Sequence, residues 1–159
     1  MAFIVGKYRV ETSGEKLLSL MFDERSNLKE EVFLEENIDQ EISSEAHGEA
    51  AIKSYKPNEI IIEASSSGRA ILILSEPFYL GWKAFVDNSP TKIYRANYAF
   101  RGVVIPEGMH QVRLSYEPDS FKTGILLSAI GATGTVILVS FLFFWSAKRT
   151  KSSLAHKSS

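Results

Sequence analysis

The sequence predicts a mainly β protein: an antiparallel β-sandwich of the jelly-roll or immunoglobulin-like class, followed by one transmembrane α-helix. Two observations lead to this prediction. Short apolar or alternating segments are separated by turn residues about every 8–12 positions, which is typical of a sandwich. Farther on, the run from Gly124 to Ala147 has no charged residue, and about 20 apolar residues suffice to cross a bilayer. We therefore expect three parts: a membrane-proximal domain over residues 1–118, a linker and transmembrane helix over 119–147, and a basic tail over 148–159.

The N-terminal third shows the weaker patterns. Residues 2–10 have a strand-like composition, and Gly6 indicates a bend or bulge within them. The run LLSLMF at residues 17–22 fits either a strand or a helix, because short apolar runs are ambiguous. A short strand is expected at VFLEE, and residues 37–50 predict an acidic, solvated loop. Calcium binding by this loop is not favoured, because its carboxylates lack a glycine-turned spacing: Asp39, Glu41, Glu45 and Glu49.

From residue 51 onward the strand pattern is regular. Turn-forming residues stand between apolar segments at 57–58, 66–68, 87–89 and 106–108. The continuous apolar runs Ile60–Ile62 and Ala70–Leu74 indicate strands covered on both faces. Two other strands alternate, with Trp82, Ala84 and Val86 on one face of the first and Val112, Leu114 and Tyr116 inward in the second. The predicted strands cover residues 51–56, 59–65, 69–75, 82–87, 90–96, 100–105 and 110–117.

The charges beside the apolar run predict its orientation. The C-terminal flank is basic, with Lys148, Arg149, Lys151 and Lys157, whereas the other flank sets Arg113 and Lys122 against Glu117 and Asp119. The positive-inside bias therefore predicts a cytoplasmic tail and an extracytoplasmic domain, and Trp145 suits the interface. The opening MAFIVGKYRV has no signal-peptide pattern. Either earlier membrane helices of a larger protein export the domain, or the chain is tail-anchored with its domain inside.

Two kinds of partner follow from the predicted helix. One is membrane lipid. The other is a second transmembrane helix, because small residues four apart allow close approach: Gly124, Ser128 and Ala132, with Gly131 and Thr135 beside them.

Composition and motifs argue against several functions. The 159 residues have a formal net charge of −1, which gives no support for nucleic-acid binding. Cysteine is absent and the three histidines are far apart, so we expect no cofactor and no metal site. Glu76 and Asp87 could act as a carboxylate pair, but Asp87 occupies a predicted hairpin turn and Glu76 precedes a proline. We therefore expect no catalytic residue in this chain, and His110, beyond a turn, is expected to be exposed.

The stretch LSEPFYLGWKAFVDN, residues 74–88, begins a dense aromatic region. Three roles are open for it: the core and rim of the sandwich, stacking on sugar rings, or contact with the headgroup region of the membrane. The candidate glycan- or partner-binding residues are Tyr79, Trp82, Tyr94, Arg95, Asn97, Tyr98 and Arg101.

A series of short motifs continues from this stretch to the start of the apolar run. They are Ser75-Glu76, Pro77-Phe78-Tyr79-Leu80-Gly81-Trp82, Val86-Asp87-Asn88, Tyr94-Arg95-Ala96-Asn97, Arg101-Gly102, Gly108-Met109-His110 and Tyr116-Glu117-Pro118. Together these motifs resemble the C-terminal signature of the bacterial YfhO family of membrane proteins. The resemblance covers about 55 residues, and Asn88 stands where the family usually has glycine.

The resemblance implies a place in the bacterial plasma membrane and a function. The family is similar to GT-C glycosyltransferases, which use lipid-linked sugars to modify cell-envelope polymers, and their catalytic acidic residues lie in an early loop that this chain lacks. The chain is thus expected to be a non-catalytic C-terminal domain with the last membrane helix, from a truncated or split protein. The alternatives are a single-pass, membrane-anchored carbohydrate- or partner-binding module, and a remnant without independent function.

Overall fold

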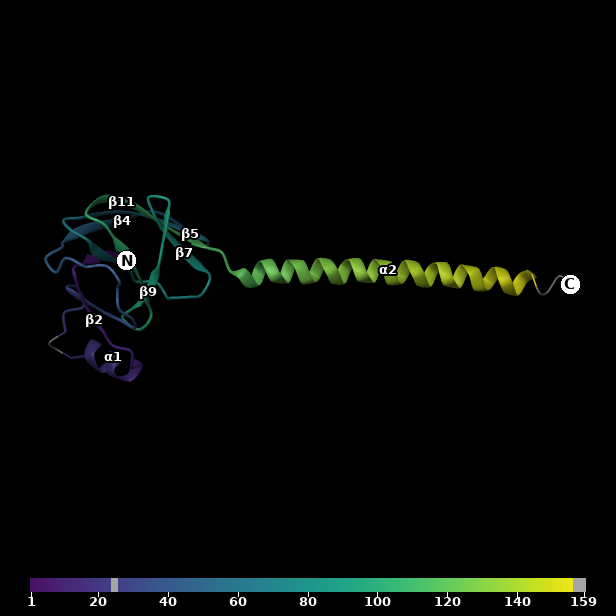
Figure 1. The fold of residues 1–159 in the computed structure, drawn as a ribbon, viewed down its shortest axis with the longest axis horizontal. Helices are drawn as coiled ribbons and strands as arrows, with labels where there is room; N and C mark the ends of the chain where they lie inside the picture. The colour runs from purple at the N-terminus through teal and green to yellow at the C-terminus, as the bar shows by residue number, and fades with distance from the viewer. Residues whose placement is uncertain (24–25, 156–159) are drawn as a thin grey trace. The chain divides into compact units, whose positions relative to one another are not determined.

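The computed structural model describes residues 1–23 and 26–155, leaving aside the side chains of residues 119, 121, 122 and 141–155. The chain divides into two compact units, Met1–Glu117 and Pro118–Ser159. The first is built from strands and one short helix, and the second contains a long helix (Figure 1). The elements are β1 (Ala2–Val5), β2 (Lys7–Val10), α1 (Gly14–Met21), β3 (Glu31–Leu34), β4 (Gly48–Lys56), β5 (Glu59–Ser66), β6 (Ala70–Leu74), β7 (Trp82–Val86), β8 (Ser89–Thr91), β9 (Ile93–Ala96), β10 (Phe100–Ile105), β11 (Gly108–Tyr116) and α2 (Asp119–Ala155).

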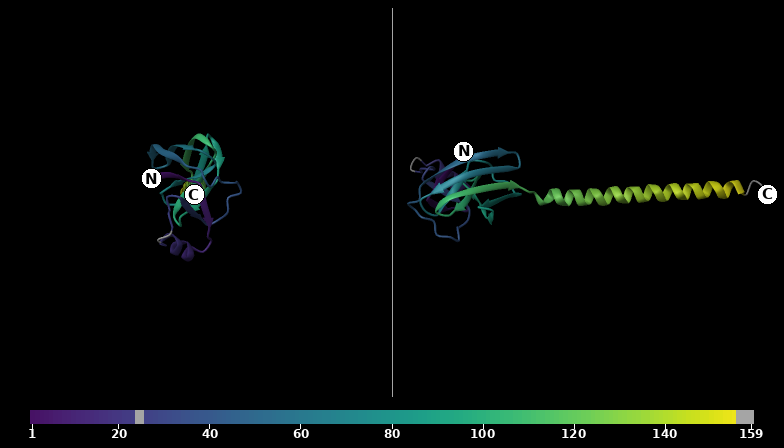
Figure 2. Two further views of the ribbon diagram at one scale, coloured as in Figure 1. Left: turned by 90° about the vertical axis from the view of Figure 1, so that its left-hand side faces the viewer. Right: turned by 90° about the horizontal axis from the view of Figure 1, so that it is seen from above.

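The strands of the described residues form two sheets, which confirms the predicted β-sandwich. A six-stranded sheet has the order β1-β6-β10-β9-β3-β2, and a five-stranded sheet has the order β4-β5-β11-β7-β8. The right-hand view of Figure 2 shows long strands of the sandwich lying side by side. All pairs are antiparallel except β2 with β3, which run parallel. The all-antiparallel expectation is therefore wrong at this edge of the six-stranded sheet.

The main core lies between the two sheets. Alternate side chains of β5 and β11 enter it, and Val112 and Leu114 are buried as predicted. Tyr116 was expected to face inward but is 36% exposed, because it lies at the last position of β11. On β7, Ala84 and Val86 are buried and Trp82 packs partly against the same core, which confirms the predicted alternation.

The six-stranded sheet is covered on both faces. In β6 every residue is buried: Leu72 and Leu74 join the core between the sheets, whereas Ile71 and Ile73 join a second apolar cluster on the opposite face. This confirms the prediction from the run Ala70–Leu74. The same prediction of burial on both faces is wrong for Ile60–Ile62. Buried and more exposed side chains alternate along β5, and Ile61 is only half-buried.

The N-terminal residues complete the six-stranded sheet. The ambiguous run at residues 17–22 is mostly helix, because residues 17–21 belong to α1. Ser13 caps the start of this helix, and its side chain accepts a hydrogen bond from the Lys16 amide. Leu17 anchors this helix with no exposed surface. Gly6 forms the predicted bend between β1 and β2. A Cβ there would lie 2.5 Å from the Ser43 carbonyl oxygen, so the close approach of the two backbones requires glycine.

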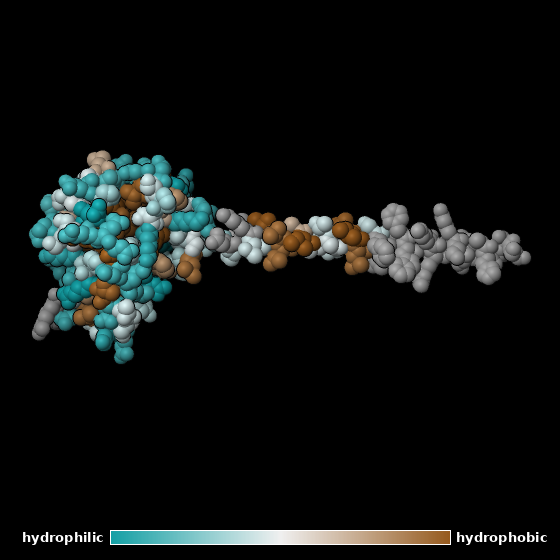
Figure 3. Space-filling view, in the orientation of Figure 1, coloured by the Kyte–Doolittle hydropathy of each residue, from teal (hydrophilic) through white to brown (hydrophobic). Residues whose placement is uncertain are grey.

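Helix α2 is long and apolar enough to cross a membrane, and within the described residues one such segment is found, Thr123–Ser140. Its 18 residues span about 27 Å at a rise of ~1.5 Å per residue. The hydroxyls of Thr133 and Thr135 donate to carbonyls one turn earlier at 2.8 Å, so they are satisfied inside the helix. Figure 3 shows apolar side chains along this segment. Trp145, Lys148, Arg149 and Lys151 lie among the side chains that are not described, and Lys157 lies outside the described residues.

Candidate binding surface

The aromatic region is built around the loop between β6 and β7, residues 75–81, here called the aromatic loop. Hydrogen bonds fix its backbone at several points: the Phe78 amide donates to the Ala99 carbonyl at 2.6 Å, and the Glu117 amide donates to the Gly81 carbonyl at 2.7 Å. Gly81 has a φ of 101°, which a side chain would strain. The loop is therefore held in one shape, and Tyr79 and Leu80 at its tip are exposed.

Arg101 is buried against the aromatic loop and contacts both Pro77 and Trp82. Its guanidinium Nε donates to the Pro77 carbonyl at 2.9 Å and its Cζ lies 4.1 Å from the centroid of the Trp82 ring. Arg101 is only 3% exposed, and burial lowers its pKa. Its Nη1 has no hydrogen-bond acceptor among the described residues. The face of the Trp82 ring therefore compensates part of the cost of burying this charge.

Trp82 joins the loop to the end of the last strand. It pairs with Tyr116 across the β7–β11 ladder, and the two ring centroids lie 5.4 Å apart at a tilted angle. Tyr116 directly precedes Glu117, whose side chain forms an ion pair with Lys83 at 3.0 Å. The aromatic loop, Trp82 and the last residues of β11 thus lie at one end of the sandwich, which we call the tether end because the chain continues there into α2.

Asn97 has a structural task at the same end. It stands with Tyr98 in the β9–β10 turn, and both have positive φ angles, 46° and 68°. Asn97 exchanges two hydrogen bonds with Phe33: the Phe33 amide donates to Asn97 Oδ1 at 2.9 Å, and the Asn97 amide donates to the Phe33 carbonyl at 2.8 Å. The asparagine therefore ties β3 to the sheet, and its side chain is buried.

The remaining candidates are dispersed. Tyr94 is buried in the second apolar cluster, on the outer face of the six-stranded sheet. Arg95 lies on the surface, where its guanidinium contacts Glu35 at 3.4 Å and lies 5.0 Å from the Phe78 ring centroid. Tyr98 is half-exposed near the start of α1. The structure thus brings Tyr79, Trp82 and Arg101 together around the aromatic loop and leaves the others apart; their role in glycan binding stays a prediction.

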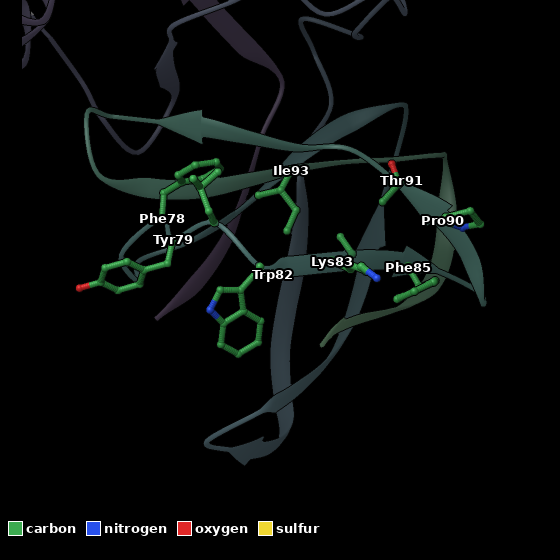
Figure 4. Close-up of a pocket in the computed structure, with 11 residues that line it drawn as sticks. Phe78, Tyr79, Trp82, Lys83, Phe85, Pro90, Thr91 and Ile93 are labelled. Carbon is green, nitrogen blue, oxygen red and sulfur yellow. The ribbon is translucent and has the colours of Figure 1, made fainter. Parts of the chain in front are cut away.

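A groove opens where the two sheets meet beside the aromatic loop. Its volume is about 270 Å³, and its lining is mostly apolar and aromatic. Figure 4 shows Ile93 pointing from β9 toward the strand that carries Trp82 and Lys83. Most of this lining belongs to the predicted aromatic stretch 74–88, of which Tyr79 and Trp82 are candidate binding residues. Pro90, Thr91 and Ile93 were not predicted to line a groove, because alternation on short strands is typical of ordinary core. The lining residues are Phe78, Tyr79, Leu80, Gly81, Trp82, Lys83, Ala84, Phe85, Pro90, Thr91 and Ile93.

The opposite end of the sandwich, here called the far end, is closed by a polar contact. Asp87 and Asn88 form the β7–β8 turn with positive φ angles of 49° and 69°, as a tight hairpin requires. Asp87 Oδ2 contacts His110 Nδ1 at 2.5 Å, and Asp87 Oδ1 accepts a hydrogen bond from the Gln111 amide at 2.9 Å. The expectation that His110 is exposed is therefore wrong, because the exposed fraction of its side chain is 17%.

This contact, here called the Asp87–His110 clasp, shifts the pKa values of both side chains. The second ring nitrogen of His110 lies 3.0 Å from the Glu107 carbonyl, so both nitrogens face acceptors and the protonated ring is favoured. The bond to Asp87 raises the pKa of His110. The bonds from His110 and the Gln111 amide lower the pKa of Asp87. Glu76, the other carboxylate considered for catalysis, instead lies near Tyr55 and raises the pKa of that phenol.

Comparison with known proteins identifies what the chain resembles. The family model described as "Bacterial membrane protein YfhO" matches residues 26–128 of this chain of 159. The protein named "Uncharacterized protein YfhO" of Bacillus subtilis (strain 168) is 26% identical over 77 residues, which are 48% of this chain and 9% of that protein. The chain therefore corresponds to a small part of this relative. No solved structure matches the chain.

Proposed function

Because the chain belongs to the bacterial membrane protein YfhO family, we propose that it provides a non-catalytic, membrane-proximal domain and the last membrane helix of a polytopic protein. That protein would transfer sugars from lipid-linked donors to cell-envelope polymers. The domain lies outside the plasma membrane and the basic tail lies in the cytoplasm. No cofactor is required by the domain in this proposal.

One observation carries the non-catalytic part of the proposal: the polar residues of the signature are engaged within the chain. Asp87 binds His110 and the Gln111 amide, Arg101 binds the Pro77 carbonyl, and Asn97 binds Phe33. These bonds hold turns and a loop in place, and among the described residues Arg101 Nη1 is the buried side-chain atom left without a partner. This pattern favours an architectural role, in which the domain positions an acceptor polymer or covers a cavity formed by other parts of a longer protein.

The helix supplies the proposed contact with other transmembrane helices. A Cβ added at Gly124 or Gly131 would meet nothing within 4 Å, so the backbone is open to close approach on this stripe. Gly124, Ser128 and Ala132 are the residues we assign to that contact. The other described side chains of the span Thr123–Ser140 face lipid in this proposal.

The catalytic question has a direct test. Membranes that contain only this chain are incubated with a radiolabelled lipid-phosphate-linked sugar and cell-wall polymer. We expect no incorporation above membranes without the chain, whereas a full-length family member supplies the positive control. Incorporation by the chain alone would overturn the non-catalytic assignment.

The orientation is tested separately, since the chain has no cysteine to interfere. A cysteine at the exposed Met109 is expected to react with a membrane-impermeant thiol reagent in intact cells, and a cysteine at Ser153 in the tail only after lysis. Reaction of the tail cysteine alone in intact cells would reverse the proposed topology.

The groove favours a second candidate function, a carbohydrate- or partner-binding module. Its aromatic lining offers faces on which a sugar ring can stack, and Phe85 contributes one without entering the main core. In a pull-down with purified cell-wall polysaccharide, Phe85→Ala should lose retention if this candidate is right, whereas Met109→Ala should not. Equal retention of both variants would exclude the groove as the binding site.

A further inference from the structure

We infer that the tether end of the sandwich is a lipid-contacting surface, with Leu80 and Tyr79 entering the interface of the same membrane that α2 crosses. This inference goes beyond the proposed function, because it holds whether or not the parent protein transfers sugars. It starts from the exposed tip of the aromatic loop, where Tyr79 is 63% and Leu80 is 87% exposed.

The first argument is position along the chain. The Gly81 carbonyl accepts the Glu117 amide at 2.7 Å, so the loop is bonded to the final residue of the first unit. Thr123, the first residue of the apolar span, follows Glu117 by six positions, which allow at most about 20 Å of extended chain. The loop tip therefore cannot lie far from the bilayer surface.

The second argument is composition. The described side chains at the tether end form a rim of aromatic residues. Trp82 and Tyr116 pack against each other with their rings tilted, and Tyr55 lies close enough to Glu76 of the loop for this carboxylate to raise the pKa of the phenol. Tyr and Trp are enriched where a protein meets lipid headgroups, because their rings are apolar and their edges are polar. The members of this rim are Tyr55, Tyr79, Trp82 and Tyr116.

The third argument is rigidity. An exposed leucine beside an exposed tyrosine is unfavourable in water, and a mobile loop would fold both side chains inward. Here the Phe78 amide, the Pro77 carbonyl and the Gly81 carbonyl are all hydrogen-bonded, so the tip is held outward. Holding apolar side chains out before contact lowers the entropy cost of binding a surface.

Two acidic side chains near the loop are paired with lysines. Lys83 forms an ion pair with Glu117 at 3.0 Å, and Lys56 forms one with Glu59 at 3.7 Å beside the β4–β5 turn. This turn belongs to the same end, since the Tyr116 amide donates to the Asn58 carbonyl at 2.9 Å. Paired charges at the rim reduce the repulsion that acidic side chains would feel from anionic headgroups.

Exposure alone does not select this site. Phe22, at the end of α1, is 83% exposed, and Met109, at the far end of β11, is 77% exposed. Among the described residues, no hydrogen bond joins either of them to the residues that lead into α2. These two side chains are therefore matched controls: they are apolar and exposed as Leu80 is, but lie elsewhere on the domain.

The test uses the full chain in vesicles of phosphatidylglycerol and phosphatidylcholine. Because the chain has no cysteine, Leu80→Cys, Phe22→Cys and Met109→Cys each carry one environment-sensitive fluorophore. We expect blue-shifted emission and several-fold stronger quenching by shallow spin-labelled lipids at position 80 than at either control. Iodide in the buffer should quench both controls and spare position 80.

Two outcomes overturn the inference. Iodide quenching at position 80 equal to that of the controls would leave the loop in water. Shielding of position 80 from both quenchers would mean that protein, such as a second copy of the chain, covers the loop. Matching circular dichroism melting curves for the three labelled variants exclude misfolding as the cause of either result. The fluorescence result does not depend on whether the parent protein transfers sugars, so failure of the proposed function would not by itself overturn the inference.

Discussion

The two ends of the sandwich are both formed by the signature motifs of residues 75–118, but their side chains have different roles. At the far end, Asp87 and His110 turn polar side chains toward each other and close a hairpin. At the tether end, Arg101 is buried beneath the loop whose tip, Tyr79 and Leu80, is exposed. The contrast teaches that one family signature combines two constraints. Several of its polar residues hold turns and a loop in place, and two adjacent exposed residues, Tyr79 and Leu80, lie at the end from which the chain leads into α2.

The largest expected effect is at the buried support of the tether end. Arg101→Ala removes the bond to the Pro77 carbonyl, the contact with the Trp82 ring and a large buried volume. We expect a loss of about 2–4 kcal/mol in the free energy of unfolding. Urea denaturation of the full chain in detergent measures it. Arg101→Met keeps the volume without burying a charge and should recover most of the loss; a Met variant as unstable as the Ala variant would show that the guanidinium contacts, not the volume, hold the loop.

The next effect concerns the turn that ties β3 to the tether end. Asn97→Ala leaves the buried Phe33 amide without its acceptor, which costs about 1–3 kcal/mol. The same denaturation experiment measures this change. Asn97→Gly serves as the control, because glycine accepts the positive φ but also lacks the acceptor. A Gly variant as stable as wild type would assign the asparagine's role to its backbone angle instead.

At the far end we expect a pH-dependent effect. The raised pKa of His110 means that its contribution is complete below about 6.5 and is lost as the pH rises through the folded-state pKa. The lowered pKa of Asp87 means that its contribution is complete above about 3.9 and is lost as the pH falls through its folded-state pKa. The clasp should therefore stabilise most between these limits.

Melting temperatures of wild type and Asp87→Asn across this pH range measure the clasp. The amide can still accept the Gln111 bond, so the variant removes mainly the charge. The difference in melting temperature should shrink above the folded-state pKa of His110. A difference that does not change with pH would contradict an ionic clasp and leave only a neutral hydrogen bond.

The smallest expected effect on stability is at the loop tip. Leu80 is exposed, so Leu80→Ser should change the free energy of unfolding by no more than about 0.5 kcal/mol. Met109→Ser at the far end is the matched variant and should behave alike in detergent. In vesicles only the Leu80 variant should lose stabilisation by lipid, measured as the shift in melting temperature between detergent and vesicles. Equal shifts in melting temperature for both variants would contradict the proposal that the tether end contacts lipid and the far end does not.

Local pattern predicted much of the fold. The apolar run Ala70–Leu74 is long, lacks polar residues and is bounded by turns, so its burial on both faces was foreseeable. The alternation at Trp82–Val86 and the Asp87-Asn88 turn likewise follow from neighbouring residues. The candidate site was less predictable. Tyr94 and Asn97 look like surface residues in the sequence but are buried, because partners distant in sequence cover them.

Local sequence patterns were sufficient to predict a β-rich domain and a segment able to cross a membrane, because strand alternation and an uncharged span depend on adjacent residues. The parallel pairing of β2 with β3, the contact of His110 with Asp87 and the position of Arg101 beneath the aromatic loop are visible in the folded structure alone. Each of these contacts joins residues more than 20 positions apart. Their formation depends on how the sheets stack, and no short window of sequence contains that information.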